Sequence, residues 1–157
     1  MKKAIVLILI AIVAVSSAFA FKFLSVGIET GNGYHISGDM EIADKFDVYA
    51  RLGYYGAFAI SGGAQYNVGE FKIGSTPVAI KPGAQMTFGF PEKSFLFDLL
   101  ATCQFSFETG HLTAFVRPGL GLAVYSYKYH SYYEDKDIRE TNTYFDWTIE
   151  CGVAYLF

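Results

Sequence analysis

Ionisable and amide side chains recur at alternate positions through the chain, a spacing that places them on one face of β-strands. Such a face could form an ion-paired plug or a path for ions or protons. Because a buried charge persists only when it is paired, we expect Lys81 and Arg117 each to lie beside a carboxylate, with Asp47, Glu108 and Glu150 as the leading candidates. The pairing favours a plug. The predicted network comprises Glu29, Asp39, Asp47, Arg51, Lys81, Gln104, Glu108, Arg117, Asp146 and Glu150.

Metal and nucleophile chemistry has weaker support. His35, His111 and His130 lie in or near different predicted strands and turns, without the spacing of a metal site, so no metal and no cofactor is predicted. Hydroxyl, imidazole and carboxyl groups do gather at one place in the sequence, as a lipid-modifying enzyme would need. They are Ser126, His130, Ser131 and Glu134. No motif spacing supports a catalytic triad, which is defined by geometry, so we predict that the chain is not an enzyme.

The N-terminus predicts export. Lys2 and Lys3 precede an apolar run at residues 4–15, and Ala-Phe-Ala at 18–20 is typical of a cleavage site. A membrane anchor is the alternative, but the run is short of the roughly 20 residues that a spanning helix needs. We therefore predict a cleaved signal peptide at 1–20, helical from 4 to about 18 and detached from a single domain at 21–157. That domain keeps all 15 acids, which disfavours nucleic acid as a partner.

The mature sequence alternates apolar and polar residues at period two, which predicts β-strands. Short links join neighbouring strands, so the sheet should be an antiparallel meander. The longest link is 130–141, and the pattern leaves open whether the 69–77 link adds pairing. The eight predicted strands are roughly 21–30, 34–42, 46–55, 57–68, 78–90, 95–108, 112–129 and 142–157.

The direction of the apolar face decides between two barrels. Bulky apolar side chains are too numerous for the interior of an eight-stranded barrel, whereas the opposite face is rich in small residues. We therefore predict an all-β, eight-stranded, antiparallel up-and-down transmembrane β-barrel, with its first strand paired to its last. The alternative is a periplasmic lipocalin-like barrel that carries an apolar ligand. The residues expected to face outward are Phe97, Leu99, Leu120, Leu122, Ile149 and Val153; those expected inward are Arg51, Lys81, Gln104, Arg117 and Glu150.

The end of the chain carries a family resemblance. Val153, Tyr155 and Phe157 alternate up to the last residue, and segments 117–123 and 151–157 look like closing strands. This pattern resembles the small eight-stranded bacterial outer-membrane β-barrel family of the opacity-protein type. The resemblance implies a location in the bacterial outer membrane and a C-terminal signal for the barrel-assembly machinery. Because that family includes adhesins, structural proteins and a few enzymes, it implies little about activity.

A surface role is the function that these features favour. The predicted 130–141 loop offers a contact surface to an extracellular partner through Tyr132, Tyr133, Glu134, Asp135 and Lys136. We therefore expect a monomeric integral outer-membrane protein, in contact with outer-membrane lipid, with a structural or surface-interaction role and a plugged lumen. A lipid A-modifying outer-membrane enzyme is a further alternative.

The two cysteines predict free thiols. Cys103 and Cys151 share the apolar face of strands six and eight, with strand seven between them. Pairing through the predicted links puts Cys103 opposite Pro118, and Pro118 opposite about Val153. Two strand spacings amount to roughly 9–10 Å, whereas a disulfide needs Cα atoms within about 7 Å.

Overall fold

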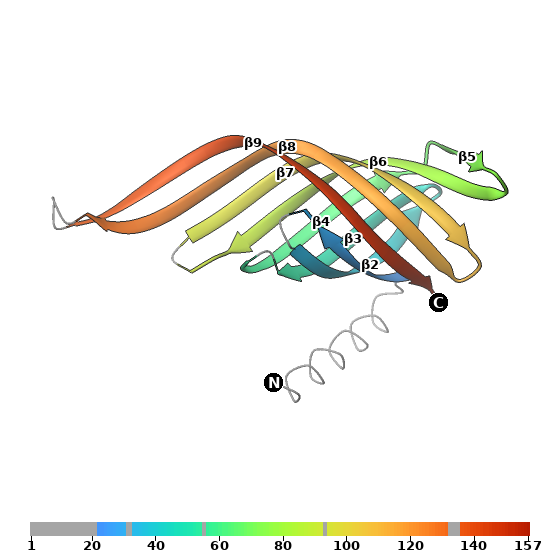
Figure 1. Ribbon diagram of the computed structural model, residues 1–157, viewed down its shortest axis with the longest axis horizontal. Coiled ribbons are helices and arrows are strands. Elements are labelled where there is room, and N and C mark those ends of the chain that lie inside the picture. Colours follow the sequence, from blue (N-terminus) through green and yellow to red (C-terminus); the bar gives the residue numbers. More distant parts are fainter. Residues whose placement is uncertain (1–21, 31–32, 55, 93, 132–135) are drawn as a thin grey trace, which may run out of the picture.

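The described part of the chain forms one antiparallel sheet that closes on itself (Figure 1). The computed structural model describes residues 22–30, 33–54, 56–92, 94–131 and 136–157. The predicted signal peptide at 1–20 lies outside them. No helix in the described ranges is long and apolar enough to cross a membrane. The strands are β1 (Phe23–Glu29), β2 (Gly33–Ala43), β3 (Phe46–Tyr54), β4 (Phe58–Tyr66), β5 (Gly69–Ile73), β6 (Thr76–Phe90), β7 (Ser94–Thr109), β8 (Leu112–Ser131) and β9 (Lys136–Leu156).

Eight of these strands form a closed ring. Val26 on β1 pairs with Ile36 on β2 and with Val153 on β9, so the first and last strands meet as predicted. The ring is completed where β4 pairs directly with β6, from Phe58 opposite Phe90 onward. The protein is therefore an eight-stranded antiparallel up-and-down barrel, in which each of the eight strands pairs with a neighbour on both sides.

The additional strand, β5, prolongs β4 instead of widening the barrel. β4 and β5 pair in succession with the same edge of β6, and the interruption lies at Asn67 and Val68. There the Asn67 amide donates to the Lys45 carbonyl at 2.8 Å and the Val68 amide donates to the Ile80 carbonyl at 3.0 Å. The turn contains Gly74 at a φ of 63°. The predicted 69–77 link is thus a hairpin that extends beyond the barrel, to the right in Figure 1.

The opposite end of the barrel carries a longer hairpin. β8 and β9 remain paired as far as Ser131 opposite Lys136, so most of the predicted 130–141 loop is β-ribbon and that prediction was wrong. Alternate tyrosines stack along β8 in this ribbon, with ring centroids 5.6 Å apart for Tyr125 and Tyr127 and 5.9 Å apart for Tyr127 and Tyr129. Figure 1 shows this hairpin projecting to the left of the barrel.

The stagger of the strands explains the projection. A path of cross-strand partners that starts at Val26 and runs through β2 returns to β9 at Thr143, ten residues before the direct partner Val153. A stagger of this kind tilts the strands relative to the barrel axis. β9 consequently continues well beyond Glu29, where β1 ends. The path passes through Ile36, Leu52, Ile60, Phe88, Phe97 and Val124.

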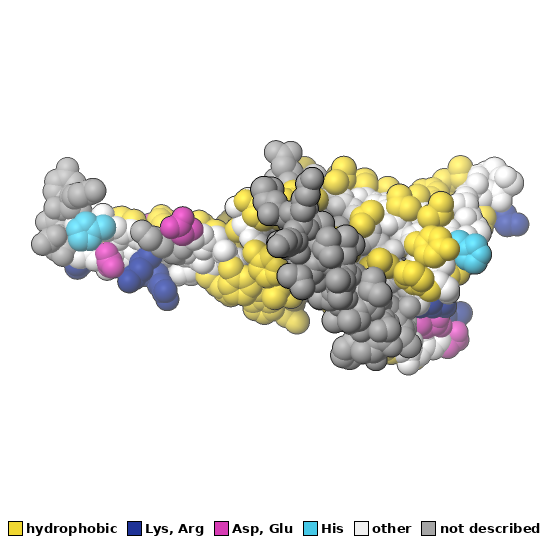
Figure 2. Space-filling view, turned by 90° about the horizontal axis from the view of Figure 1, so that it is seen from below, with side chains coloured by type: hydrophobic (Ala, Val, Ile, Leu, Met, Phe, Trp, Pro, Cys, Tyr) yellow, Lys and Arg dark blue, Asp and Glu magenta, His cyan; other side chains and the backbone are white. Residues whose placement is uncertain are grey.

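The two faces of the wall are chemically distinct, with the apolar face outward as predicted. Hydrophobic side chains cover much of the outer wall visible in Figure 2. Of the six residues expected outward, five are exposed, whereas Phe97 is half-buried because its ring packs on Phe88 at 5.2 Å. The residues expected inward are buried except Lys81, which is half-buried. A soluble carrier needs the opposite arrangement, because its apolar side chains line the interior.

Two neighbouring glycines on β4 provide a test of the inner packing. A Cβ on Gly63 would lie 2.4 Å from the Tyr49 ring and 2.5 Å from the Ala84 carbonyl oxygen, whereas a Cβ on Gly62 would approach nothing closer than 3.5 Å. We expect Gly63→Ala to destabilise the barrel by about 1–3 kcal/mol, as overpacking does. Gly62→Ala should leave the urea midpoint of unfolding almost unchanged. Equal midpoints for the two variants would contradict the position of Tyr49.

The cysteines share the outer face, but the predicted register was wrong. Pro118 pairs with Ile149, not with Val153, and Cys151 pairs with Val116. Cys103 lies on β7 and Cys151 on β9, with β8 between them, and neither forms a disulfide in the structure. The separation of the two strands agrees with the geometric reason for predicting free thiols.

Candidate functional site

Glu150 is the centre of a buried ion-paired network inside the barrel. Its side chain on β9 is almost inaccessible to solvent, at 1% exposure. Glu150 Oε2 accepts hydrogen bonds from Arg51 Nη2 at 2.6 Å and from Arg117 Nη1 at 3.1 Å. His35 Nε2 lies 2.9 Å from the other carboxylate oxygen, Oε1. Groups from β2, β3 and β8 therefore converge on one carboxylate of β9, across the lumen.

Strand register and small residues make this convergence possible. Arg117 on β8 and Glu29 on β1 are the direct cross-strand partners of Glu150, so all three side chains enter the lumen at one level. His35 lies opposite Gly27, and a Cβ on Gly27 would be 2.6 Å from the imidazole ring. Glycine at position 27 therefore leaves the space that the imidazole occupies.

A second group of side chains holds Arg117 in place. Its Nε donates to Gln104 Oε1 at 2.9 Å, and Gln104 Nε2 donates to Ser106 Oγ at 2.7 Å. The guanidinium lies 4.2 Å from the centre of the Tyr49 ring, and the Tyr49 hydroxyl donates to Gln85 Oε1 at 3.1 Å. Cation–π contact is strongest where both groups are desolvated, as they are here. Arg117 is thus bonded in its plane and covered on its face.

Lys81 and Asp47 form a separate ion pair toward the β5–β6 end of the lumen. Lys81 Nζ donates to Asp47 Oδ2 at 2.8 Å, and both side chains are 13% exposed. A cavity of about 20 Å³ lies beside this pair and is also lined by Gln104, Ser106 and Phe115. Such a volume holds about one water molecule.

The remaining predicted residues lie in different surroundings. Glu29 belongs to the hub, by which we mean the ion-paired network around Glu150. Its carboxylate accepts hydrogen bonds from Arg51 Nη1 at 3.3 Å and from Thr148 Oγ1 at 2.6 Å. Asp39 is buried and Asp146 half-buried, whereas Glu108 is exposed at the end of β7 and forms no ion pair among the described residues. Glu108, one of the leading candidates, is therefore not the partner of Lys81 or Arg117.

The structure describes all three predicted C-terminal residues but only one of the predicted surface-loop residues. Tyr132, Tyr133, Glu134 and Asp135 lie outside the described residues, and Lys136 is the first residue of β9. Val153, Tyr155 and Phe157 are exposed on the outer wall, where the Tyr155 and Phe157 rings are 5.3 Å apart. The C-terminal aromatic residues therefore face the same surroundings as the apolar wall.

Sequence reasoning did not single out Tyr49, although its position contained a signal. Tyr49 lies on β3 between Asp47 and Arg51, at the same spacing of two, so its side chain must share their inward face. Its residue type gives no such signal, because tyrosine is also common on the apolar wall. Gln85 and Thr148 were likewise missed and follow the same alternation on their own strands.

The chemistry available to the network is charge neutralisation. Two guanidinium groups, Arg51 and Arg117, face two carboxylates, Glu29 and Glu150, so the charges balance. The described residues contain no group of three or more His, Cys, Asp or Glu side chains that could hold a metal ion. The buried site therefore pairs opposite charges inside the barrel.

Ser126 and His130, two members of the predicted hydroxyl–imidazole group, have different partners among the described residues. Ser126 Oγ accepts from Thr141 at 3.2 Å, whereas His130 Nδ1 lies 3.2 Å from Asp137 Oδ1. Four residues along one strand separate the Cα atoms of Ser126 and His130 by about 13 Å, beyond hydrogen-bond reach. Glu134 lies outside the described residues. The geometry thus gives no support to a triad built on Ser126 and His130.

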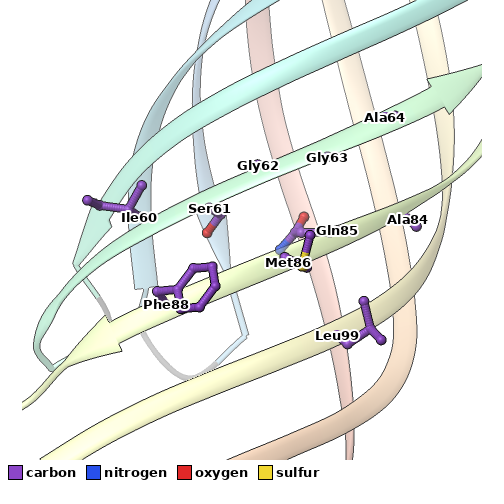
Figure 3. A pocket seen from close by; sticks show the side chains of 10 residues that line it. All are labelled: Ile60, Ser61, Gly62, Gly63, Ala64, Ala84, Gln85, Met86, Phe88 and Leu99. Atoms are coloured by element: carbon purple, nitrogen blue, oxygen red, sulfur yellow. The ribbon is translucent and has the colours of Figure 1, made fainter.

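A shallow groove of about 520 Å³ lies on the outer wall over β4, β6 and β7 (Figure 3). Its floor is formed by small residues, including Gly62, Ala64 and Ala84. Larger apolar side chains surround it, among them Ile60, Met86, Phe88 and Leu99, and no charged side chain lines it. The groove is therefore part of the apolar wall and is distinct from the polar lumen.

Comparisons with known proteins add little. No family model matches the chain, and no curated protein matches it. A solved structure described as KdgM porin is similar over 86% of this chain and 98% of its own chain, with 12% sequence identity and a TM-score of 0.32. Because a likeness at that level carries no argument about function, the fold rests on the strand pairings.

Proposed function

We propose that the mature chain is an integral barrel of a bacterial outer membrane, of the small opacity-protein type, with a structural or surface-interaction role. The observation that carries this proposal is the closed ring whose outer wall exposes large apolar side chains while charged side chains fill its interior. In water, so much exposed apolar surface would be unfavourable, whereas lipid covers it without cost. Closure of the ring satisfies the backbone hydrogen bonds, as a hydrocarbon environment requires.

The projecting β8–β9 hairpin supports the surface role. It extends stacked tyrosines and alternating charges beyond the ring, at the end of the barrel opposite to the C-terminus. With the chain termini on the periplasmic side, this hairpin stands outside the cell, where an extracellular partner can reach it. Outer-membrane lipid is the second partner, and the barrel-assembly machinery is the partner during insertion, through Val153, Tyr155 and Phe157.

Cell fractionation tests the proposal. The mature protein should sediment with outer membranes, require detergent for extraction, and begin at Phe21 when its N-terminus is sequenced. Its band should shift on gel electrophoresis when the sample is boiled, because a closed barrel resists unfolding in detergent until it is heated. Recovery of the protein in the soluble periplasmic fraction would contradict the proposal and favour a lipocalin-like carrier.

The Glu150 network predicts that the barrel does not conduct. Arg51 and Arg117 both donate to Glu150 across the lumen, and the cavity beside Lys81 and Asp47 measures about 20 Å³. Single-channel recording in planar bilayers should therefore show no large, steady conductance from the purified wild-type protein. A stable porin-like open state would contradict the plug while leaving the membrane location intact.

A further inference from the structure

The outer face of the β8–β9 hairpin has a positively charged hollow at its base. This hollow measures about 330 Å³ and is lined by Ser94, Phe95, Ser126, Lys128 and Arg139. We refer to it as the hairpin-base hollow. It is separate from the lumen, because Phe95, Ser126, Lys128 and Arg139 belong to the outward-facing alternation of β7, β8 and β9.

The hollow lies at the border between the apolar wall and the polar hairpin. Phe95 on β7 pairs with Ser126 on β8. The next outward-facing pair, one step further toward the C-terminal end of β7, is Phe97 with Val124. The Phe95 ring also lies within 6.3 Å of the Phe88 and Phe90 rings, which belong to the exposed apolar wall. Figure 2 shows Lys and Arg side chains on the projecting hairpin beside the hydrophobic wall. A lipid against that wall would therefore place its head group at the hollow.

The charges of the hollow are incompletely balanced. Lys128 and Arg139 are direct cross-strand partners, an arrangement in which like charges disfavour the ribbon. Asp137 Oδ2 accepts from Lys128 Nζ at 3.2 Å, and hydrogen bonding by His130 and Lys128 lowers the pKa of Asp137. Arg139 has no hydrogen bond or ion pair from its side chain to any described residue. Among the described residues, the Arg139 guanidinium therefore has no counter-charge, and it lies beside the ammonium group of Lys128.

The chemistry that suits this arrangement is a phosphate. A guanidinium binds phosphate oxygens with two parallel hydrogen bonds, and an ammonium group adds a point charge. The Ser126 hydroxyl accepts from Thr141 and still has its own proton to donate. We propose that the hairpin-base hollow binds the phosphate of an outer-leaflet lipid, held by Arg139, Lys128 and Ser126, with its acyl chains along Phe95 and the apolar wall. This proposal rests on the proposed function.

Lipid binding can be measured on the mature protein purified in dodecyl maltoside micelles. The probes are bis-phosphorylated lipid A and the same lipid with both phosphates removed, and native mass spectrometry counts the lipids retained. We expect retention of one phosphorylated lipid A. Arg139→Gln and Lys128→Gln should each weaken that binding about tenfold, because each removes a charge-assisted contact.

Lys136→Gln is the matched control. Lys136 lies on the same hairpin but belongs to the opposite, inward-facing alternation of β9, so its removal should leave lipid A retention unchanged. Without lipid, Arg139→Gln should melt no earlier than the wild type, because the variant loses only a repulsive contact with Lys128. A lower melting temperature would instead indicate that Arg139 is structural and would overturn the proposal.

Further outcomes separate the proposal from its alternatives. Equal retention of dephosphorylated lipid A, or equal losses for Lys136→Gln and Arg139→Gln, would overturn it. Displacement of lipid A by equimolar inorganic phosphate would show a site for free phosphate that does not use the wall, and would also overturn it. If the protein were soluble without detergent, the proposed function itself would be wrong. If it required detergent and shifted on heating but did not bind lipid A, the proposed function would stand and only the lipid-binding inference would be wrong.

Discussion

Replacing Glu150 by alanine should destabilise the barrel by about 3–5 kcal/mol, which is the cost of leaving partners of a buried ion pair unpaired. The carboxylate is the shared acceptor of Arg51 and Arg117 and lies beside His35, and all three side chains are buried. In the variant, two guanidinium groups would face a single remaining carboxylate, Glu29. The loss should appear as a lower urea midpoint for unfolding from lipid vesicles.

Two further variants show whether the buried charge is the cause. Glu150→Gln keeps the shape of the side chain and one acceptor oxygen but removes the charge, so its midpoint should lie between those of the wild type and the alanine variant. Asp137→Asn removes a carboxylate from the exposed ion pair with Lys128, and its midpoint should stay close to wild type. If Glu150→Ala and Asp137→Asn shifted the midpoint equally, the hub would have no special part in stability.

An arginine on the outer wall should be costly only where lipid surrounds it. Leu120 lies near the middle of β8 and Leu112 is its first residue, and both side chains point outward at 58% and 49% exposure. We expect Leu120→Arg to lower the free energy of unfolding from vesicles by about 2–4 kcal/mol, and Leu112→Arg by about 0–1 kcal/mol, since the cost depends on depth in the bilayer. Urea titration of both variants in the same vesicles measures the difference.

The comparison between the two leucines also discriminates between barrels. In a barrel exposed to water, both arginines would be solvated and the two variants would unfold alike. A similar small change for Leu120→Arg and Leu112→Arg would therefore contradict a lipid-facing wall. Failure of Leu120→Arg to insert at all would agree with the prediction, provided that Leu112→Arg inserts normally.

The alternation of apolar and polar residues predicts the face of the sheet on which a side chain lies better than it predicts the residue opposite on the next strand. The predicted loop at 130–141 placed the turn too late in the chain, because the ladder extends to Ser131 opposite Lys136. The partner of Pro118 was therefore placed at about Val153, four residues from the observed Ile149. A displacement of four residues is two full repeats of a strand, which changes the level of a side chain but not its face. The outward and inward sets were therefore correct although the register of the last hairpin was not.

The hub itself could not be derived from the chain alone. The alternation of side chains along each strand places Arg51 and Glu150 on the inner face. However, β3 and β9 are separated in the sheet by β2 and β1, so the two side chains meet across the lumen. That contact depends on the curvature and stagger of the closed ring, which follow from all the registers together. The Lys81–Asp47 contact similarly joins β6 and β3 past β4.

The most direct test uses the only tryptophan in the chain. Trp147 lies on β9 opposite Leu120, and its side chain is 56% exposed on the outer wall. In vesicles that contain lipids with brominated acyl chains, its fluorescence should be blue-shifted and strongly quenched, while aqueous iodide should have little effect. Emission at the wavelength of a water-exposed indole, quenched by iodide and indifferent to the brominated lipids, would contradict the central claim that the apolar wall of this barrel faces a membrane.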